Sequence, residues 1–343
     1  MKHKVFVLFA TLVLAAGCGG DSTPTAPVAA PPTTEQPTTE PVAVERTAID
    51  PMTDFGTTAS NVFFYYEDVE RATTFYREVM GLRVAADYGF AKIMQVAPKS
   101  FITLVDAAEG MHDADEPKTT AIALVTDQLD EWWDYLQTQD IEMRSDSYDP
   151  VPGRAHHGFV AIDPEGYFLE FERFNEHPEN TELMPVLDSM DTLYADPAAS
   201  NVPEGLGFKA TVVWFYYKDM EGIQRFYEDV LGFDLIVDQG WAKIYPVGPT
   251  GFFGLVDETR GMHSFTEEKG VTMSFITDDI DGWFDYVSGS GALEMRHSEV
   301  QDDRRYRAFV AYDPEGYYLE WDIFSDAAEN GDLNAAIGAA ADD

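Results

Sequence analysis

Short β-rich runs alternate with helical patterns from residue 61 onward. The run 61–66 is dominated by aromatic residues and Val, and the stretch 69–80 carries its apolar residues at helical spacing. Asp68 suits the N-cap of this helix and Gly81 suits its end. Three further strand-like runs follow, separated by short turns, at 82–87, 90–97 and 101–106. The predicted order of elements is therefore β-α-β-β-β.

The same order is repeated along the chain. A strand at 120–126 and an amphipathic helix precede three more strands, so that a second module occupies 120–126, 128–139, 141–145, 156–163 and 167–174. The segment FYYEDVERATTFYREVMG at 64–81 then returns as FYYKDMEGIQRFYEDVLG at 215–232. The second copy predicts two strand–helix pairs, at 211–217 with 219–231 and at 270–277 with 279–289. A repeat of this length indicates two copies of a whole domain. We expect an α+β fold with four βαβββ modules in two tandem domains.

The repeat and the composition around it divide the chain into six segments. We expect a signal peptide at 1–18, a Pro/Thr-rich tether at 19–58, a first domain at 59–175, a linker at 176–208, a second domain at 209–325 and an acidic, Ala-rich tail at 326–343. The tether cannot bury enough apolar surface to fold, so we expect it to be extended.

The N-terminal segment has the pattern of a bacterial lipoprotein signal. Lys2 and Lys4 precede an apolar run, 5–16, which is too short to span a bilayer as a helix. Cys18 follows this run and is the only cysteine of the chain. We predict that Cys18 is lipidated and that the protein is exported and held at a bacterial membrane by this lipid alone.

The composition argues against nucleic acid as a partner. The chain has 22 Lys and Arg against 62 Asp and Glu, a formal net charge of −40. A surface this acidic repels nucleic-acid phosphates and anionic lipid headgroups.

Two motifs recur at fixed places in both copies. The first, FYxxxxG, ends the first helix of each copy, and the second, DPxGxxxE, lies in the last strand; they occupy 75–81 and 163–170, then 226–232 and 313–320. In this order they resemble the vicinal oxygen chelate superfamily, which includes glyoxalase I, bleomycin-resistance proteins and extradiol dioxygenases. The resemblance covers about 61–174 and 211–324. It implies that paired modules curl into open cups and that the two copies form a pseudo-dimer within one chain.

The resemblance also assigns positions for metal ligands: the first strand of each module and the Glu of the last strand. Counting seven residues back from the residue expected to open each helix gives two sets, Asn61, Thr120 and Glu170 in the first copy and Val212, Val271 and Glu320 in the second. Val has no donor atom, and a single carboxylate with Asn and Thr suits Zn, Fe or Ni poorly. We expect no metal site of the family type and no cofactor. A divalent metal on His112 and Glu170 is a weaker alternative.

Aromatic residues share the faces on which those ligands would lie. Because alternate strand residues point the same way, Phe63 and Tyr65 accompany Asn61, while Trp214 and Tyr216 lie on the matching face of the second copy. Such walls suit a small, partly apolar ligand, including a cation, or they fill the cups as core. Burial among aromatics would also suit Glu170 and Glu320 as general acids or bases.

Two lysines and two histidines occur at the same place in both copies. Lys92 and Lys243 lie inside apolar strands, where each must reach water or a partner or bind an anionic ligand group. His112 and His263 follow the fourth strand of their modules, in a loop that is either exposed to solvent or closes over a cup.

These features support three functional hypotheses. The first is a membrane-anchored, metal-independent small-molecule binding protein. The second is a glyoxalase-type lyase, epimerase or dioxygenase with a rearranged site that uses His112 or His263. The third is a protein-interaction module whose cups are filled.

Overall fold

The computed structural model describes residues 49–338 of the chain. The predicted signal peptide, its Cys18 and the tether up to residue 48 lie outside the described residues. Within the described part, no helix is both long enough and apolar enough to cross a membrane.

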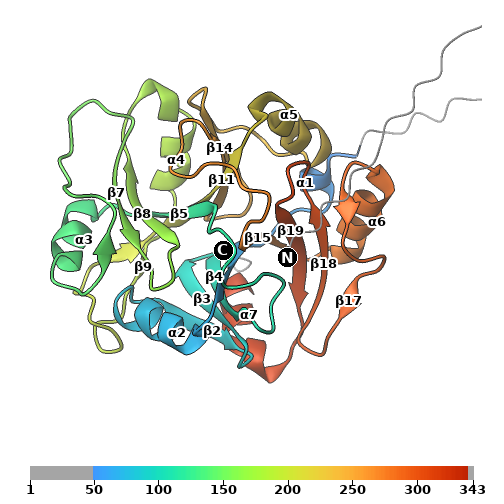
Figure 1. The fold of residues 1–343 in the computed structure, drawn as a ribbon, viewed down its shortest axis with the longest axis horizontal. Helices are drawn as coiled ribbons and strands as arrows, with labels where there is room; N and C mark the ends of the chain where they lie inside the picture. The colour runs from blue at the N-terminus through green and yellow to red at the C-terminus, as the bar shows by residue number, and fades with distance from the viewer. Residues whose placement is uncertain (1–48, 339–343) are drawn as a thin grey trace, which may run out of the picture. The chain divides into compact units, whose positions relative to one another are not determined.

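The order of elements confirms the prediction of four βαβββ modules (Figure 1). The first module comprises β1 (Ala59–Tyr66), α2 (Val69–Glu78), β2 (Arg83–Asp87), β3 (Ala91–Ala97) and β4 (Ser100–Asp106). The second comprises β5 (Thr120–Val125), α3 (Leu129–Leu136), β6 (Glu142–Met143), β7 (His156–Ile162) and β8 (Phe168–Phe174). The third comprises β11 (Ala210–Tyr217), α5 (Met220–Arg225), β12 (Val237–Asp238), β13 (Ala242–Pro246) and β14 (Gly251–Asp257). The fourth comprises β15 (Val271–Ile276), α6 (Ile280–Ser290), β16 (Glu294–Met295), β17 (Gln301–Asp302), β18 (Tyr306–Tyr312) and β19 (Tyr318–Phe324).

The two copies exchange modules when the sheets form. One sheet, here sheet A, runs in the order β16-β18-β19-β15-β1-β4-β3-β2, with β17 beside β18, so it joins the first module to the fourth. The other, sheet B, runs in the order β12-β13-β14-β11-β5-β8-β7-β6 and joins the second module to the third. The joints are antiparallel: β1 pairs with β15 and β11 pairs with β5. Each cup is therefore built from both copies.

Helix ends follow the residues that the sequence suggested. The Asp68 side chain accepts a hydrogen bond from the Arg71 N–H, and Asp219 caps α5 in the same way through the Gly222 N–H. Gly81 and its counterpart Gly232 have φ of 71° and 69°, a left-handed conformation that favours glycine at a helix end.

A buried aspartate ties the last strand of each copy to the first helix. Asp163 accepts hydrogen bonds from the hydroxyls of Tyr66 and Tyr76, at 2.6 and 3.0 Å, and from the backbone N–H groups of Glu165 and Tyr167. Asp313 does the same with the matching residues of the second copy. Such satisfied buried carboxylates fix the geometry of the DPxG turn.

The segments expected as linker and tail form matching structures. Between the copies lie η1 (Pro178–Asn180), α4 (Leu183–Asp188), β9 (Leu193–Tyr194) and β10 (Gly207–Phe208). After β19 come η3 (Ala328–Asn330) and α7 (Gly331–Gly338), while α1 (Pro51–Asp54) precedes β1 and a π-helical turn, η2 (Phe226–Val230), extends α5. Leu183 and Leu187 pack on the concave side of sheet B, and Leu333 packs on that of sheet A. Each short helix closes one end of a cup.

Candidate functional site

The concave side of sheet A forms a cavity of about 220 Å³, here cup A. Its walls are largely aromatic and come from β1, the turn before β3, β18 and β19: Phe63, Tyr65, Tyr88, Phe90, Tyr306 and Phe324. Its floor carries two carboxylates of β19, Glu320 and Asp322. Residues of β19 two positions apart point to the same face, which brings this pair together.

The two carboxyl groups of cup A are buried, and the negative charge of Asp322 disfavours ionisation of Glu320. Glu320 is 7% exposed and Asp322 is 2% exposed. Ser274 donates a hydrogen bond to Asp322 at 2.5 Å, whereas Oε2 of Glu320 has no hydrogen-bond partner among the described residues. Burial, and then the charge of Asp322, raises the pKa of Glu320 well above its usual range. Burial also raises the pKa of Asp322 to about 6.

The concave side of sheet B forms a second cavity, cup B, of about 320 Å³. It opens onto an outer hollow of about 850 Å³ beside the 147–158 loop. Two acidic residues lie on its floor, Glu170 and Glu172 of β8, and its aromatic walls include Trp214, Tyr216 and Trp241.

In cup B a histidine balances one of the two carboxylates. Glu172 is 1% exposed, and its Oε1 lies 2.5 Å from Nδ1 of His156. This contact with Glu172 raises the pKa of His156 to about 9, so the pair is ionic at neutral pH. Burial, and then the charge of Glu172, raises the pKa of Glu170 to about 8.

The predicted grouping of Asn61, Thr120 and Glu170 in one cup is wrong. Asn61 lies in β1 of sheet A, whereas Thr120 and Glu170 lie in β5 and β8 of sheet B. Thr120 also lies on the face opposite the cup: it pairs with Phe215, and its strand neighbours Ile122 and Leu124 belong to the main hydrophobic core. Val271, which was predicted to lie with Glu320, is likewise on the face opposite the cup and belongs to the main hydrophobic core.

The residues at the metal-ligand positions do not fit a metal ion. Counted from the true helix caps, Gln128 and Asp279, the positions fall on Ala121 and Val212 with Glu170 in cup B, and on Asn61 and Thr272 with Glu320 in cup A. Ala and Val have no donor atoms. In cup A, Oδ1 of Asn61 accepts from Thr103 at 3.0 Å, and Oγ1 of Thr272 is bonded to the Tyr65 hydroxyl at 2.9 Å. Among residues 49–338 no three His, Cys, Asp or Glu side chains cluster as metal ligands.

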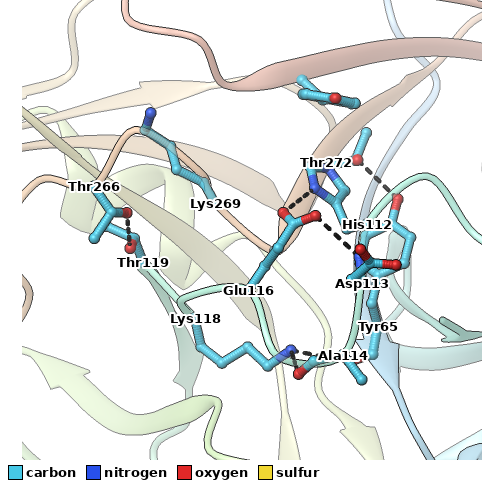
Figure 2. A network of polar contacts seen from close by, with 12 residues as sticks. Tyr65, His112, Asp113, Ala114, Glu116, Lys118, Thr119, Thr266, Lys269 and Thr272 are labelled. Carbon is cyan, nitrogen blue, oxygen red and sulfur yellow. Dashed lines mark hydrogen bonds and ion pairs between the residues drawn. The ribbon is translucent and has the colours of Figure 1, made fainter. Parts of the chain in front are cut away.

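His112 is buried beside cup A (Figure 2), and His263 is half-buried beside cup B, so neither side chain is exposed to solvent. The His112 ring packs between Tyr65 and Tyr318, at centroid distances of 4.8 and 4.2 Å, and its Nδ1 lies 2.7 Å from Glu116. His263 packs between Tyr216 and Phe168 in the same manner. Burial lowers the pKa of His263 to about 4. His112 is therefore next to cup A and Glu170 is in cup B, so the alternative metal pair His112–Glu170 is not brought together.

Lys92 and Lys243 face away from the cups. Lys92 lies 3.0 Å from both Asp87 and Glu70, and Lys243 lies 2.7 Å from Asp238. The neighbouring cup-facing residues are Ala91 in cup A and Ala242 in cup B. The structure supports ion pairs with neighbouring carboxylates and not contact with a ligand, although β3 and β13 each lie one strand in from the sheet edge.

Sequence reasoning missed three residues that define the cups: Asp322, Glu172 and His156. The first two carried a usable signal, because each lies two positions after a predicted cup carboxylate on the same strand. His156 has no counterpart in the second copy, where Tyr306 stands at that place, and this difference contributes to the different charge of the two cups.

Comparison with known proteins supports the fold. Residues 58–171 match the model of the Glyoxalase/Bleomycin resistance protein/Dioxygenase superfamily. Glyoxalase I from Zea mays superposes with a TM-score of 0.56 at 14% identity, over 85% of this chain and 99% of that one. A Bacillus subtilis protein assigned to the dioxygenases superposes with a TM-score of 0.56 at 13% identity, over 82% and 90%. No curated protein matches the sequence.

Proposed function

We propose that the chain is an exported, lipid-anchored protein that binds small organic molecules in its cups without a metal of the superfamily type. The lipid anchor and export rest on the sequence around Cys18 alone. A Cys18→Ala variant that leaves the membrane fraction, and loses incorporation of labelled palmitate, would support this part. Retention of the variant in the membrane would contradict it.

Ligand binding rests chiefly on one observation in cup A. Oε2 of Glu320 is buried at the floor of an aromatic cavity, and among the described residues only the neighbouring carboxyl group of Asp322 is close enough to share a proton with Glu320. An unpaired buried acceptor is costly unless a ligand supplies the missing donor. An ammonium group would supply the donor, would favour the ionised form of Glu320 that burial and Asp322 disfavour in the empty cup, and would also be attracted to the faces of the surrounding rings. The volume of about 220 Å³ is below the range typical of drug-sized ligands. We therefore infer a small ligand with an amine group and an apolar body.

Benzylamine and its uncharged analogue benzyl alcohol test this assignment. Titration calorimetry on the whole protein should show benzylamine binding at least about tenfold more tightly than benzyl alcohol, because only the amine carries a charge. Glu320→Gln should remove this preference. Glu170→Gln is the matched control in cup B and should preserve it. Equal binding of both compounds, or a preference that survives Glu320→Gln, would overturn the assignment.

Catalysis is the second candidate, and one observation favours it. A carboxyl group with a pKa of about 8, as in Glu170, can exchange a proton near neutral pH, as a general acid or base must. Bound compounds recovered chemically unchanged after long incubation would support binding alone. Conversion that disappears in Glu170→Gln would make the protein an enzyme. The hypothesis of filled cups fails if any of these probes stabilises the fold.

A further inference from the structure

Some basic side chains of this acidic protein form ion pairs with carboxylates and others do not. With 62 Asp and Glu against 22 Lys and Arg, most cations should find a carboxylate nearby. Three arginines around cup B make no ion pair among the described residues, namely Arg144, Arg154 and Arg260. Arg144 lines the inner cavity, Arg154 lines the outer hollow, and Arg260 lines both.

These arginines come from three different elements that converge on one opening. Arg144 follows β6, Arg154 lies in the loop before β7, and Arg260 follows β14. The guanidinium of Arg144 lies 5.2 Å from the Phe168 ring centre, and that of Arg260 lies 5.2 Å from the Trp241 ring centre. Packing against an aromatic ring leaves the N–H edges of a guanidinium free to donate, in a geometry that matches a carboxylate.

The acidic residues of cup B do not cancel this positive charge. Glu172 is neutralised by His156 at 2.5 Å, and burial disfavours the charged form of Glu170. The outer hollow adds Asp149 and Glu179, together with His157 and His177. Glu179 lies 4.0 Å from His177.

Cup A has a more acidic lining than cup B. Its lining includes Glu109, Glu320 and Asp322 but no Lys or Arg among the described residues. Arg305, which lies nearby over the Tyr88 ring, is paired with Asp303 at 2.9 Å. Arg296 holds the place of Arg144 over the Tyr318 ring and also makes no ion pair among the described residues, but it donates to the hydroxyls of Tyr312 and Tyr318 at 3.2 Å. Glu109 stands where cup B has Arg260. Two unpaired guanidinium groups lining one cavity are therefore a property of cup B.

We propose that cup B binds an organic carboxylate with a flat apolar body. The carboxylate would lie between Arg144 and Arg260, and the body would pack against Trp214, Tyr216 and Trp241 in the inner cavity. This inference rests on the proposed function, because it names the ligand class of one of its two cups. The cavity of about 320 Å³ has room for a bicyclic ring.

The test uses 2-naphthoate and its uncharged counterpart 2-naphthamide, measured by titration calorimetry on the whole protein. Naphthoate should bind more tightly than the amide, and the double variant Arg144→Gln/Arg260→Gln should weaken naphthoate binding at least about tenfold while leaving the amide unchanged. Arg225→Gln/Arg307→Gln is the control matched for net charge, since both arginines are paired with carboxylates and neither lines cup B or its outer hollow. It should have little effect.

The outcomes separate this inference from the proposed function. Naphthoate and naphthamide of equal affinity, or naphthoate binding that survives the double variant, would overturn the inference. If benzylamine still binds cup A in that case, the proposed function stands. If neither benzylamine nor naphthoate binds, the proposed function fails with it. Loss of naphthoate binding in Glu320→Gln would also overturn the inference, because it would place the ligand in cup A.

Discussion

Cup A and cup B have the same skeleton and different linings. Tyr65 in cup A corresponds to Tyr216 in cup B, and Glu320 corresponds to Glu170. The second carboxylate differs in its surroundings: Asp322 has a serine partner, whereas Glu172 has a histidine. The DPxG turns and their tyrosine networks are identical in both copies. Duplication has thus kept the groups that hold the strands in place and changed those that set charge.

The largest difference between the cups should appear when Glu172 of cup B or Asp322 of cup A is replaced by its amide, because the two changes should shift the free energy of unfolding in different ways. We expect Glu172→Gln to lower the free energy of unfolding by about 2–3 kcal/mol, because it leaves His156 without its counter-charge. The value is below that of a fully buried pair because the His156 side chain is 40% exposed. Asp322→Asn should be neutral or stabilising by about 1 kcal/mol, since it relieves repulsion with Glu320. Urea unfolding at pH 7 measures both. Equal losses would show that the two pairs are equivalent.

The pH dependence of stability should differ between the cups. The pKa of His156 is raised to about 9, so its stabilisation is complete below about pH 6.5 and is lost as the pH rises to about 9. Solvent screening limits this to about 1–2 kcal/mol. The pKa of Asp322 is raised to about 6, so cup A should lose stability as the pH rises from about 4 to about 6.

Urea titrations at a series of pH values measure these slopes. Glu172→Gln should flatten the curve above pH 6.5, and Asp322→Asn should flatten it between about pH 4 and 6. If Glu172→Gln leaves the alkaline slope intact, another group carries it.

An exchange of residues between the cups should have a smaller effect. Asn61 of cup A corresponds to Val212 of cup B, and Asn61→Val should cost about 0.5–1 kcal/mol. The change leaves the Thr103 hydroxyl without its acceptor, but it also removes the Nδ2 group of Asn61, which is buried without a partner among the described residues. Thermal unfolding of the variant measures the balance. A loss above about 2 kcal/mol would show that the amide has a further partner.

Metal ions should have the smallest effect on the melting temperature, and the two cups should not differ in this respect. Neither donor set fits a divalent ion, so EDTA, Zn²⁺ or Ni²⁺ should shift Tm by less than about 1 °C. Differential scanning fluorimetry of the untreated protein is the measurement, and Glu320→Gln and Glu170→Gln are the controls. A metal-dependent rise in Tm that either variant abolishes would restore a metal site to that cup.

Much of the fold could be predicted from the sequence because local signals agreed. N-cap aspartates, the glycines that end helices and the runs of aromatic and β-branched residues located most elements to within a few residues. The match of Leu183 and Asn180 with Leu333 and Asn330 is present in the sequence, but it lies in the segments that the composition assigned to a linker and a tail. Asn180 and Asn330 each donate to two backbone carbonyls, which secures the turns before α4 and α7.

The composition of the cups could not be predicted, for two physical reasons. Strands β5 and β15 are buried along their whole length, so their sequences carry no alternation that would reveal the cup face. The sequence also does not show which first strands pair with each other, because the first strands of the four modules, β1, β5, β11 and β15, are all apolar and of similar length. A one-residue error in the helix start then moved Thr120 and Val271 to the wrong face.

The exchange of modules also has a consequence for synthesis. Tyr65 is bonded to Thr272, which lies 207 residues later in the chain. During translation at about 5–20 residues per second, the first half would wait roughly 10–40 s before its partner strand exists. Until then β1 and β5 present open edges that can pair with other chains. The growing protein therefore depends on being kept apart from its neighbours, and shortened products that end after β8 should associate as dimers or aggregate.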